Sequence, residues 1–114
     1  MEERILEILA NNKIKNVQVL NTNFKGSIVN NIIVGTFASE KNTRQTALKI
    51  KENLEMEFGE ISIDGEFPGD WIILGVEDTF VELMTEDKRA YYNLEKFWGD
   101  NKASLNKLKT KLKK

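Results

Sequence analysis

The stretch WIILGVEDTFVELMTEDKRAYYNLEKFW, residues 71–98, decides the fold. It begins with a dense apolar run at 71–74, bounded by glycines, which is typical of a strand buried on both faces. Glu77 and Asp78 then predict a tight turn, and residues 79–84 predict a second strand because they are rich in β-branched and apolar side chains. The two strands are therefore expected to form an antiparallel hairpin.

A helix is predicted directly after this hairpin. Thr85 can cap its N-terminus, and the two acids that follow suit the positive end of the helix dipole. Three residues recur at helical spacing and are expected to face the sheet: Ala90, Leu94 and Phe97. Aromatic residues at such spacing are usually core residues. However, Tyr91 and Tyr92 point about 100° apart on a helix, so part of this aromatic surface is expected to face solvent.

The first 70 residues predict five further elements. These are a short helix at 2–11, a half-exposed strand at 17–20, a continuous apolar strand at 32–34, a long helix at about 40–58 and an alternating strand at 60–64. Ser39 is predicted to cap the long helix and Gly59 to end it. Its predicted core stripe is Thr43, Ala47, Ile50, Leu54 and Phe58. The order α-β-β-α-β-β-β-α predicts a single α/β (α+β) domain, with a mixed five-stranded sheet and flanking helices.

Composition favours a binding protein over an enzyme. With 114 residues, 40% apolar and 31% charged, the chain is expected to form one soluble globular domain. No apolar run approaches the roughly 20 residues of a membrane span, and the start Met-Glu-Glu is unlike a signal peptide, so a cytoplasmic location is expected. The chain has no Cys and no His. Disulfides and thiolate metal sites are therefore excluded, and the commonest general base and zinc ligand are missing.

Charge is distributed unevenly along the chain. The net charge is −1, but residues 102–114 hold 6 of the 17 basic side chains and no acid. The rest of the chain therefore holds 11 basic and 18 acidic side chains, a formal charge of −7, and favours a basic partner. The lysine-rich tail could bind RNA or a membrane. Its apolar stripe is only one residue wide, so a solvated, frayed terminus is the preferred interpretation.

Glu77, Asp78 and Glu82 raise the alternative of metal-assisted phosphoryl chemistry, as in nucleotidyltransferase-like folds. Asp78 and Glu82 are four residues apart on a strand, roughly 13 Å at about 3.3 Å per residue. This separation is too large for both to hold one metal ion at ligand distances of about 2.0–2.6 Å. The segment 35–37 also lacks the lysine of a P-loop. A turn acid and a solvated strand face are therefore preferred, and no catalytic or metal-binding residue is predicted.

The stretch 71–98 resembles the ribosomal silencing factor family, also called the Iojap family. The family pattern is a Trp-led apolar strand, a Gly-Asp turn, a Val-rich strand and an Arg-x-Tyr-Tyr-x-Leu-Glu-x-x-Trp helix. The matching positions are Trp71, Asp78, Val81, Arg89, Tyr91, Tyr92, Leu94, Glu95 and Trp98. A weaker match at 17–47 extends the resemblance to about residues 3–100. It implies a ribosomal silencing factor domain at 1–100 with nucleotidyltransferase-like topology, and leaves the lysine-rich tail at 101–114 outside.

Three positions depart from the family pattern. Gly75 stands where Asp is usual, Glu77 where Gly is usual and Glu82 where His is usual. A two-residue hairpin turn needs a positive φ, which costs a non-glycine residue about 1 kcal/mol or more. We therefore expect either a looser turn or a left-handed Asp78.

The resemblance implies a translational repressor that is not an enzyme and needs no cofactor. Family members bind the large ribosomal subunit through ribosomal protein L-fourteen, block joining of the small subunit when nutrients are short, and can assist late large-subunit assembly. The partner-binding residues expected here are Trp71, Val76, Asp78, Arg89, Tyr91, Tyr92, Glu95 and Trp98. The alternatives are an RNA-binding module acting through the tail and, less favoured, a degenerate metal-dependent nucleotidyltransferase. The oligomeric state stays open, and a homodimer away from the ribosome is one state that the resemblance allows.

The helix surface that bears Arg89, Tyr92 and Trp98 is expected to form one exposed patch with the hairpin turn at 76–78. Arg89 and Tyr92 are neighbours at i and i+3, Trp98 lies near the same edge, and the turn at 76–78 precedes the helix. Exposed Tyr and Trp beside Arg is the composition of a protein-binding hot spot. Tyr92→Ala is therefore expected to weaken binding with little loss of stability.

Overall fold

The computed structural model describes residues 1–21 and 31–92. The predicted element order is confirmed within them: α1 (Glu2–Asn11), β1 (Lys15–Asn21), β2 (Asn31–Thr36), α2 (Thr43–Phe58), β3 (Ser62–Asp64), β4 (Trp71–Val76), β5 (Thr79–Met84) and α3 (Glu86–Tyr92). The predicted continuation of α3, with Leu94, Glu95, Phe97 and Trp98, lies outside the described residues, as does the lysine-rich tail.

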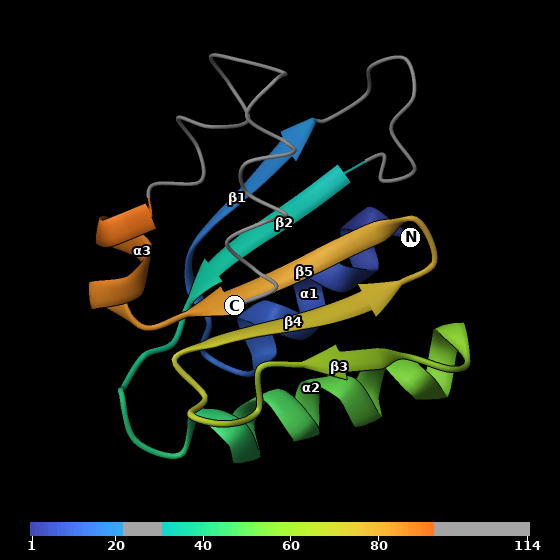
Figure 1. Ribbon diagram of the computed structural model, residues 1–114. Coiled ribbons are helices and arrows are strands. Elements are labelled where there is room, and N and C mark those ends of the chain that lie inside the picture. The colour runs from blue at the N-terminus through green and yellow to red at the C-terminus, as the bar shows by residue number, and fades with distance from the viewer. Residues whose placement is uncertain (22–30, 93–114) are drawn as a thin grey trace.

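The five strands form one mixed sheet in the order β1-β2-β5-β4-β3 (Figure 1). The β2–β5 pair is parallel and the other three pairs are antiparallel. The predicted mixed five-stranded sheet is therefore confirmed. A parallel pair needs a long crossover connection, which here contains α2, β3 and β4. Because Thr36 pairs with Met84 at the ends of β2 and β5, the segments that follow these two strands leave the sheet at the same end.

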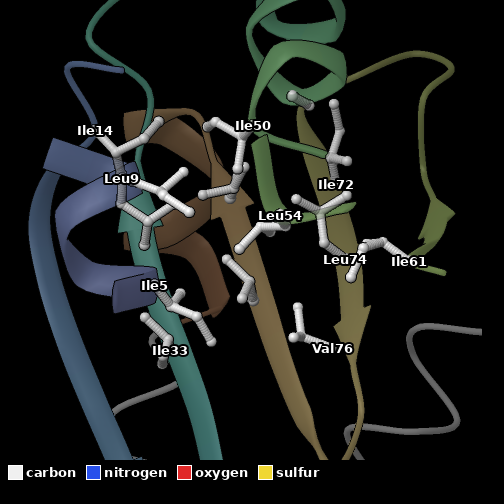
Figure 2. Close-up of a cluster of buried hydrophobic side chains, with 14 of the residues drawn as sticks. Ile5, Leu9, Ile14, Ile33, Ile50, Leu54, Ile61, Ile72, Leu74 and Val76 are labelled. Atoms are coloured by element: carbon white, nitrogen blue, oxygen red, sulfur yellow. The ribbon is translucent and has the colours of Figure 1, made fainter. Parts of the chain in front are cut away.

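α1 and α2 pack on one face of the sheet, and the hydrophobic core lies between the two layers (Figure 2). The core includes Ile5 and Leu9 from α1, Ile50 and Leu54 from α2, and Ile33, Ile72, Leu74 and Val76 from the sheet. Four residues of the predicted α2 stripe are buried, and Phe58 is half-buried. Each fully buried aliphatic side chain contributes about 1.5–3 kcal/mol relative to an exposed one. This layer is therefore the main hydrophobic contribution from the described residues.

The predicted start of α2 is wrong by three residues. The helix begins at Thr43 rather than Glu40, and Ser39 Oγ accepts a hydrogen bond from Lys41 N at 3.1 Å within a local turn. Asn42 precedes the helix with a φ of 60°, a left-handed conformation that Asn tolerates better than most residues. The predicted end is confirmed, because Gly59 follows the helix with a φ of 83°.

β4 is buried on one face rather than on both. Ile72, Leu74 and Val76 are buried against the helices, whereas the alternate residues Trp71, Ile73 and Gly75 are only half-buried. A continuous apolar run does not distinguish a half-buried apolar face from a fully buried one. The expectation failed because α1 and α2 pack on the face of the sheet that carries Ile72, Leu74 and Val76, and the alternate residues point the other way.

The predicted hairpin of β4 and β5 is confirmed, but its turn differs in detail. Pairing runs from Trp71–Met84 to Val76–Thr79 and leaves two turn residues, Glu77 and Asp78. Glu77 itself takes the positive φ of 55°. Both expected alternatives, a looser turn and a left-handed Asp78, are therefore wrong, because the strand pairing keeps the turn tight up to its last pair.

Candidate partner-binding surface

Trp71 lies at the same end of the sheet as α3. It pairs with Met84 at the end of β5, and Thr85 N donates a hydrogen bond to the Asp70 carbonyl at 3.1 Å. The start of β4 is thereby joined to the start of α3. The Trp71 side chain is half-buried, and its indole Nε1 donates a hydrogen bond to Glu82 Oε1 at 2.9 Å.

Glu82 is completely buried, so its interpretation as part of a solvated strand face is wrong. Oε1 accepts the indole hydrogen bond of Trp71, and Oε2 has no hydrogen-bond partner in the part of the chain that the structure describes. Burial raises the pKa of this carboxyl to about 7, against the smaller opposing effect of the Trp71 hydrogen bond. The sequence did hold a signal for this burial, because Phe80 and Met84, which share the strand face of Glu82, are apolar.

Arg89 points from α3 toward the β1–β2 pair and is half-buried. Its Nη1 donates to the Asn16 carbonyl and to Thr36 Oγ1, the latter at 2.9 Å. Asn16 has a φ of 53° at an irregularity in the β1–β2 pairing, and such bulges redirect the groups of a strand. Arg89 therefore holds α3 against the sheet, whether or not it also contacts a partner.

The predicted cap and the predicted solvent-facing aromatic of α3 are both confirmed. Lys88 N donates to Thr85 Oγ1 at 3.5 Å, and the Tyr91 side chain is 77% exposed. Ala90, however, is exposed, so the expectation that it faces the sheet is wrong. Arg89, rather than Ala90, points toward the sheet, because its hydrogen bonds are made to β1 and β2. The Tyr92 side chain lies outside the described part of the structure.

The expected single patch that joins α3 to the hairpin turn is wrong. The turn and α3 lie at opposite ends of β5 (Figure 1), and a six-residue strand spans roughly 20 Å at about 3.3 Å per residue. Val76 is also fully buried in the core, whereas Asp78 is exposed in the turn. Sequence proximity misled here because the turn is joined to the helix through the whole length of β5. Partner contact by the individual residues stays a prediction.

An open pocket of about 740 Å³ lies beside Tyr91, between the start of α2, the loop before β4, and α3. Its lining includes the acids Glu40, Asp70 and Asp87. Lys88 also lines it, with Nζ 3.8 Å from Asp70 Oδ2. Sequence analysis missed this grouping because the three acids come from separate segments. We call the surface formed by Asp70, Trp71, Asp87, Lys88 and Tyr91 the α3-end surface.

The model of the family described as "Ribosomal silencing factor during starvation" matches residues 1–114. The chain belongs to this family. A ribosomal silencing factor RsfS from Halalkalibacterium halodurans is 34% identical over 86 residues, which cover 73% of this chain and 74% of the relative. The factor of the same name from Chromobacterium violaceum is 28% identical over 101 residues, covering 88% and 83%.

Solved structures agree with this assignment. A crystal structure of a Chromobacterium violaceum protein superposes with a TM-score of 0.77 at 26% identity, covering 88% of this chain and 84% of that chain. One from Bacillus halodurans superposes with a TM-score of 0.70 at 28% identity, covering 85% and 91%. The family name associates the chain with the ribosome and with regulation of translation.

Two further observations concern the described part of the chain alone. Within residues 1–21 and 31–92, no helix is long and apolar enough to cross a membrane. The same residues contain no group of three or more His, Cys, Asp or Glu placed to hold a metal ion.

Proposed function

We propose that this protein is a translational repressor that acts in the cytoplasm on the large ribosomal subunit. In this proposal it binds ribosomal protein L-fourteen on the face that meets the small subunit, and its bulk prevents the two subunits from joining. No nucleotide and no cofactor takes part. The family match over the whole chain supports the ribosome as the target.

The observation that carries the choice of surface is the position of two family-pattern aromatics. Trp71 and Tyr91 both belong to the α3 end of the sheet, and Tyr91 is largely exposed. Exposed Tyr and Trp are enriched among the residues that dominate binding energy at protein interfaces. We therefore assign the contact with L-fourteen to the α3-end surface rather than to the hairpin turn.

Charge supports a basic protein as the partner. Asp70 and Asp87 stand beside a single lysine on the α3-end surface, and Glu40 lines the adjoining pocket. Complementary charge raises the association rate and suppresses wrong partners more than it raises affinity. The lysine-rich tail carries the opposite charge, and we assign to it at most a weak contact with ribosomal RNA.

The test is co-sedimentation with isolated large subunits. Tyr91→Ala should weaken binding roughly thirtyfold, because truncation of a hot-spot aromatic costs about 2 kcal/mol or more. The melting temperature should barely change, since the side chain is 77% exposed.

Met56→Ala is the matched control. Met56 is 80% exposed near the C-terminal end of α2, outside the α3-end surface, so its truncation should leave binding unchanged. Equal affinities for the two variants would contradict the assignment of the surface.

A further inference from the structure

Glu82 lies on the sheet face that points away from α1 and α2. It pairs with Val34 on β2 and with Ile73 on β4, and paired residues share a face of the sheet. Phe80 and Met84, two residues away on β5, also share this face. The neighbours of Glu82 within the sheet are thus apolar, and Trp71 is its diagonal neighbour on β4.

No charged group of the described residues adjoins the Glu82 carboxyl. On this face Asp64 on β3 pairs with Ile73, Lys15 on β1 pairs with Thr36, and Arg89 donates a hydrogen bond to Thr36. Burial is the largest cause of the raised pKa of Glu82, and the other cause within the described residues is the hydrogen bond from Trp71, which lowers the pKa. Among residues 1–21 and 31–92, the one hydrogen bond to this carboxyl comes from the indole N–H of Trp71.

A carboxyl group in this position costs stability, because a buried polar atom without a partner loses its hydration. An apolar side chain of similar length would avoid this cost, since Oε2 is unpaired. The feature that an apolar residue could not supply is the acceptor for the indole. Glu82 can therefore fix the orientation of the Trp71 indole, which an apolar side chain at this position could not do through a hydrogen bond.

We propose that Glu82 is a positioning residue, whose hydrogen bond to Nε1 holds the Trp71 indole in the orientation with which the α3-end surface meets its partner. This inference rests on the proposed function. A side chain that is already fixed loses less conformational freedom on binding. Loss of one hydrogen bond, at about 1–1.4 kcal/mol, corresponds to roughly five- to tenfold in affinity.

Two substitutions separate this role from a structural one. Glu82→Met removes the acceptor and relieves the unpaired oxygen, so the melting temperature should stay equal or rise while affinity for large subunits falls five- to tenfold. Glu82→Gln keeps an oxygen acceptor and should retain affinity within about twofold. Wild-type affinity in Glu82→Met, or an equal loss in both variants, would overturn the proposal.

A resonance measurement tests the same hydrogen bond without the ribosome. The protein has two tryptophans, and the indole N–H signal that is absent from Trp71→Phe belongs to Trp71. In the wild type this signal should move with a midpoint near the Glu82 pKa of about 7, and in Glu82→Gln it should not move with pH over that range.

The two experiments can fail separately. A wild-type protein that does not bind large subunits would contradict the proposed function, while a titrating Trp71 signal would still support the positioning bond. A signal that does not titrate, or that titrates equally in Glu82→Gln, would overturn this inference even if binding were intact.

Discussion

At the scale of single residues, two glutamates occupy positions that cost stability. Glu82 is a buried carboxyl with one unpaired oxygen, and Glu77 is a non-glycine residue with a φ of 55°. Each departs from the residue usual in the family pattern. Natural sequences break local rules mainly at functional or strained sites. Glu82 has a partner that suggests such a role, whereas nothing in the structure gives one to Glu77.

Glu82 should make the stability of the protein fall as the pH rises through neutrality. Its pKa is raised from 4.5 to about 7 in the folded protein, so the folded state holds the proton more tightly. The stabilisation that comes from this tighter proton binding is fully present below pH 4.5 and is lost as the pH rises through 7. Between about pH 5.5 and 8, the free energy of unfolding should fall by about 2 kcal/mol relative to Glu82→Gln.

Urea denaturation of the wild type and of Glu82→Gln at a series of pH values measures this difference. Parallel curves for the two proteins would show that the buried carboxyl does not titrate as proposed.

Replacement of Glu77 by glycine should stabilise the protein. Glycine adopts positive φ without a Cβ penalty, and the gain should be about 0.5–1 kcal/mol after the greater freedom of the unfolded chain is deducted. The control is Asp78→Gly in the same turn, because Asp78 is not among the residues with positive φ and gains nothing from the change. Thermal unfolding of both variants decides the matter, and equal shifts would argue against strain at Glu77.

At the scale of elements, α3 is held to the sheet by polar contacts at its first turns. Its cap comes from Thr85, Arg89 reaches β1 and β2, and Lys15 forms an ion pair with Glu86 at 3.1 Å. These contacts fix the end of the sheet at which Trp71 and Tyr91 lie. The geometry of the α3-end surface therefore depends on side-chain hydrogen bonds as well as on apolar packing.

Arg89→Met should loosen α3 while leaving the central strands intact. It removes hydrogen bonds from a charged donor, worth about 1.5–3 kcal/mol each, so the α3 amides should exchange hydrogen at least tenfold faster. The control is Lys15→Met, which removes an ion pair between exposed side chains worth under about 1 kcal/mol. Unchanged exchange in α3 of Arg89→Met would show that other contacts hold the helix.

At the scale of the whole molecule, the element order and the mixed sheet could be predicted because apolar periodicity depends on local sequence. The hairpin of β4 and β5, the α2 stripe and the Thr85 cap are examples. What could not be predicted depends on contacts between distant segments. Arg89 turns inward because a carbonyl of β1 lies near it, and the burial of Glu82 and its hydrogen bond to Trp71 exist only in the folded sheet. The pocket acids likewise meet only in the folded chain.

Removal of residues 102–114 should leave the domain folded. Residues between Ile5 and Leu83 supply the core between the helices and the sheet, so we expect the melting temperature to change little. Binding to large subunits should weaken slightly and become less dependent on salt, as expected when lysines near phosphates are lost. Complete loss of binding by the truncated protein would transfer recognition to the tail.

The most direct test of the account is the joining of purified ribosomal subunits in the presence of the wild-type protein. Light scattering or gradient centrifugation measures how much 70S ribosome forms as the protein is added to large subunits before small subunits. We predict that 70S formation falls as the protein saturates the large subunits, without nucleotide, and that Tyr91→Ala needs roughly thirtyfold more protein for the same effect. Undiminished 70S formation at saturation would contradict the proposed function.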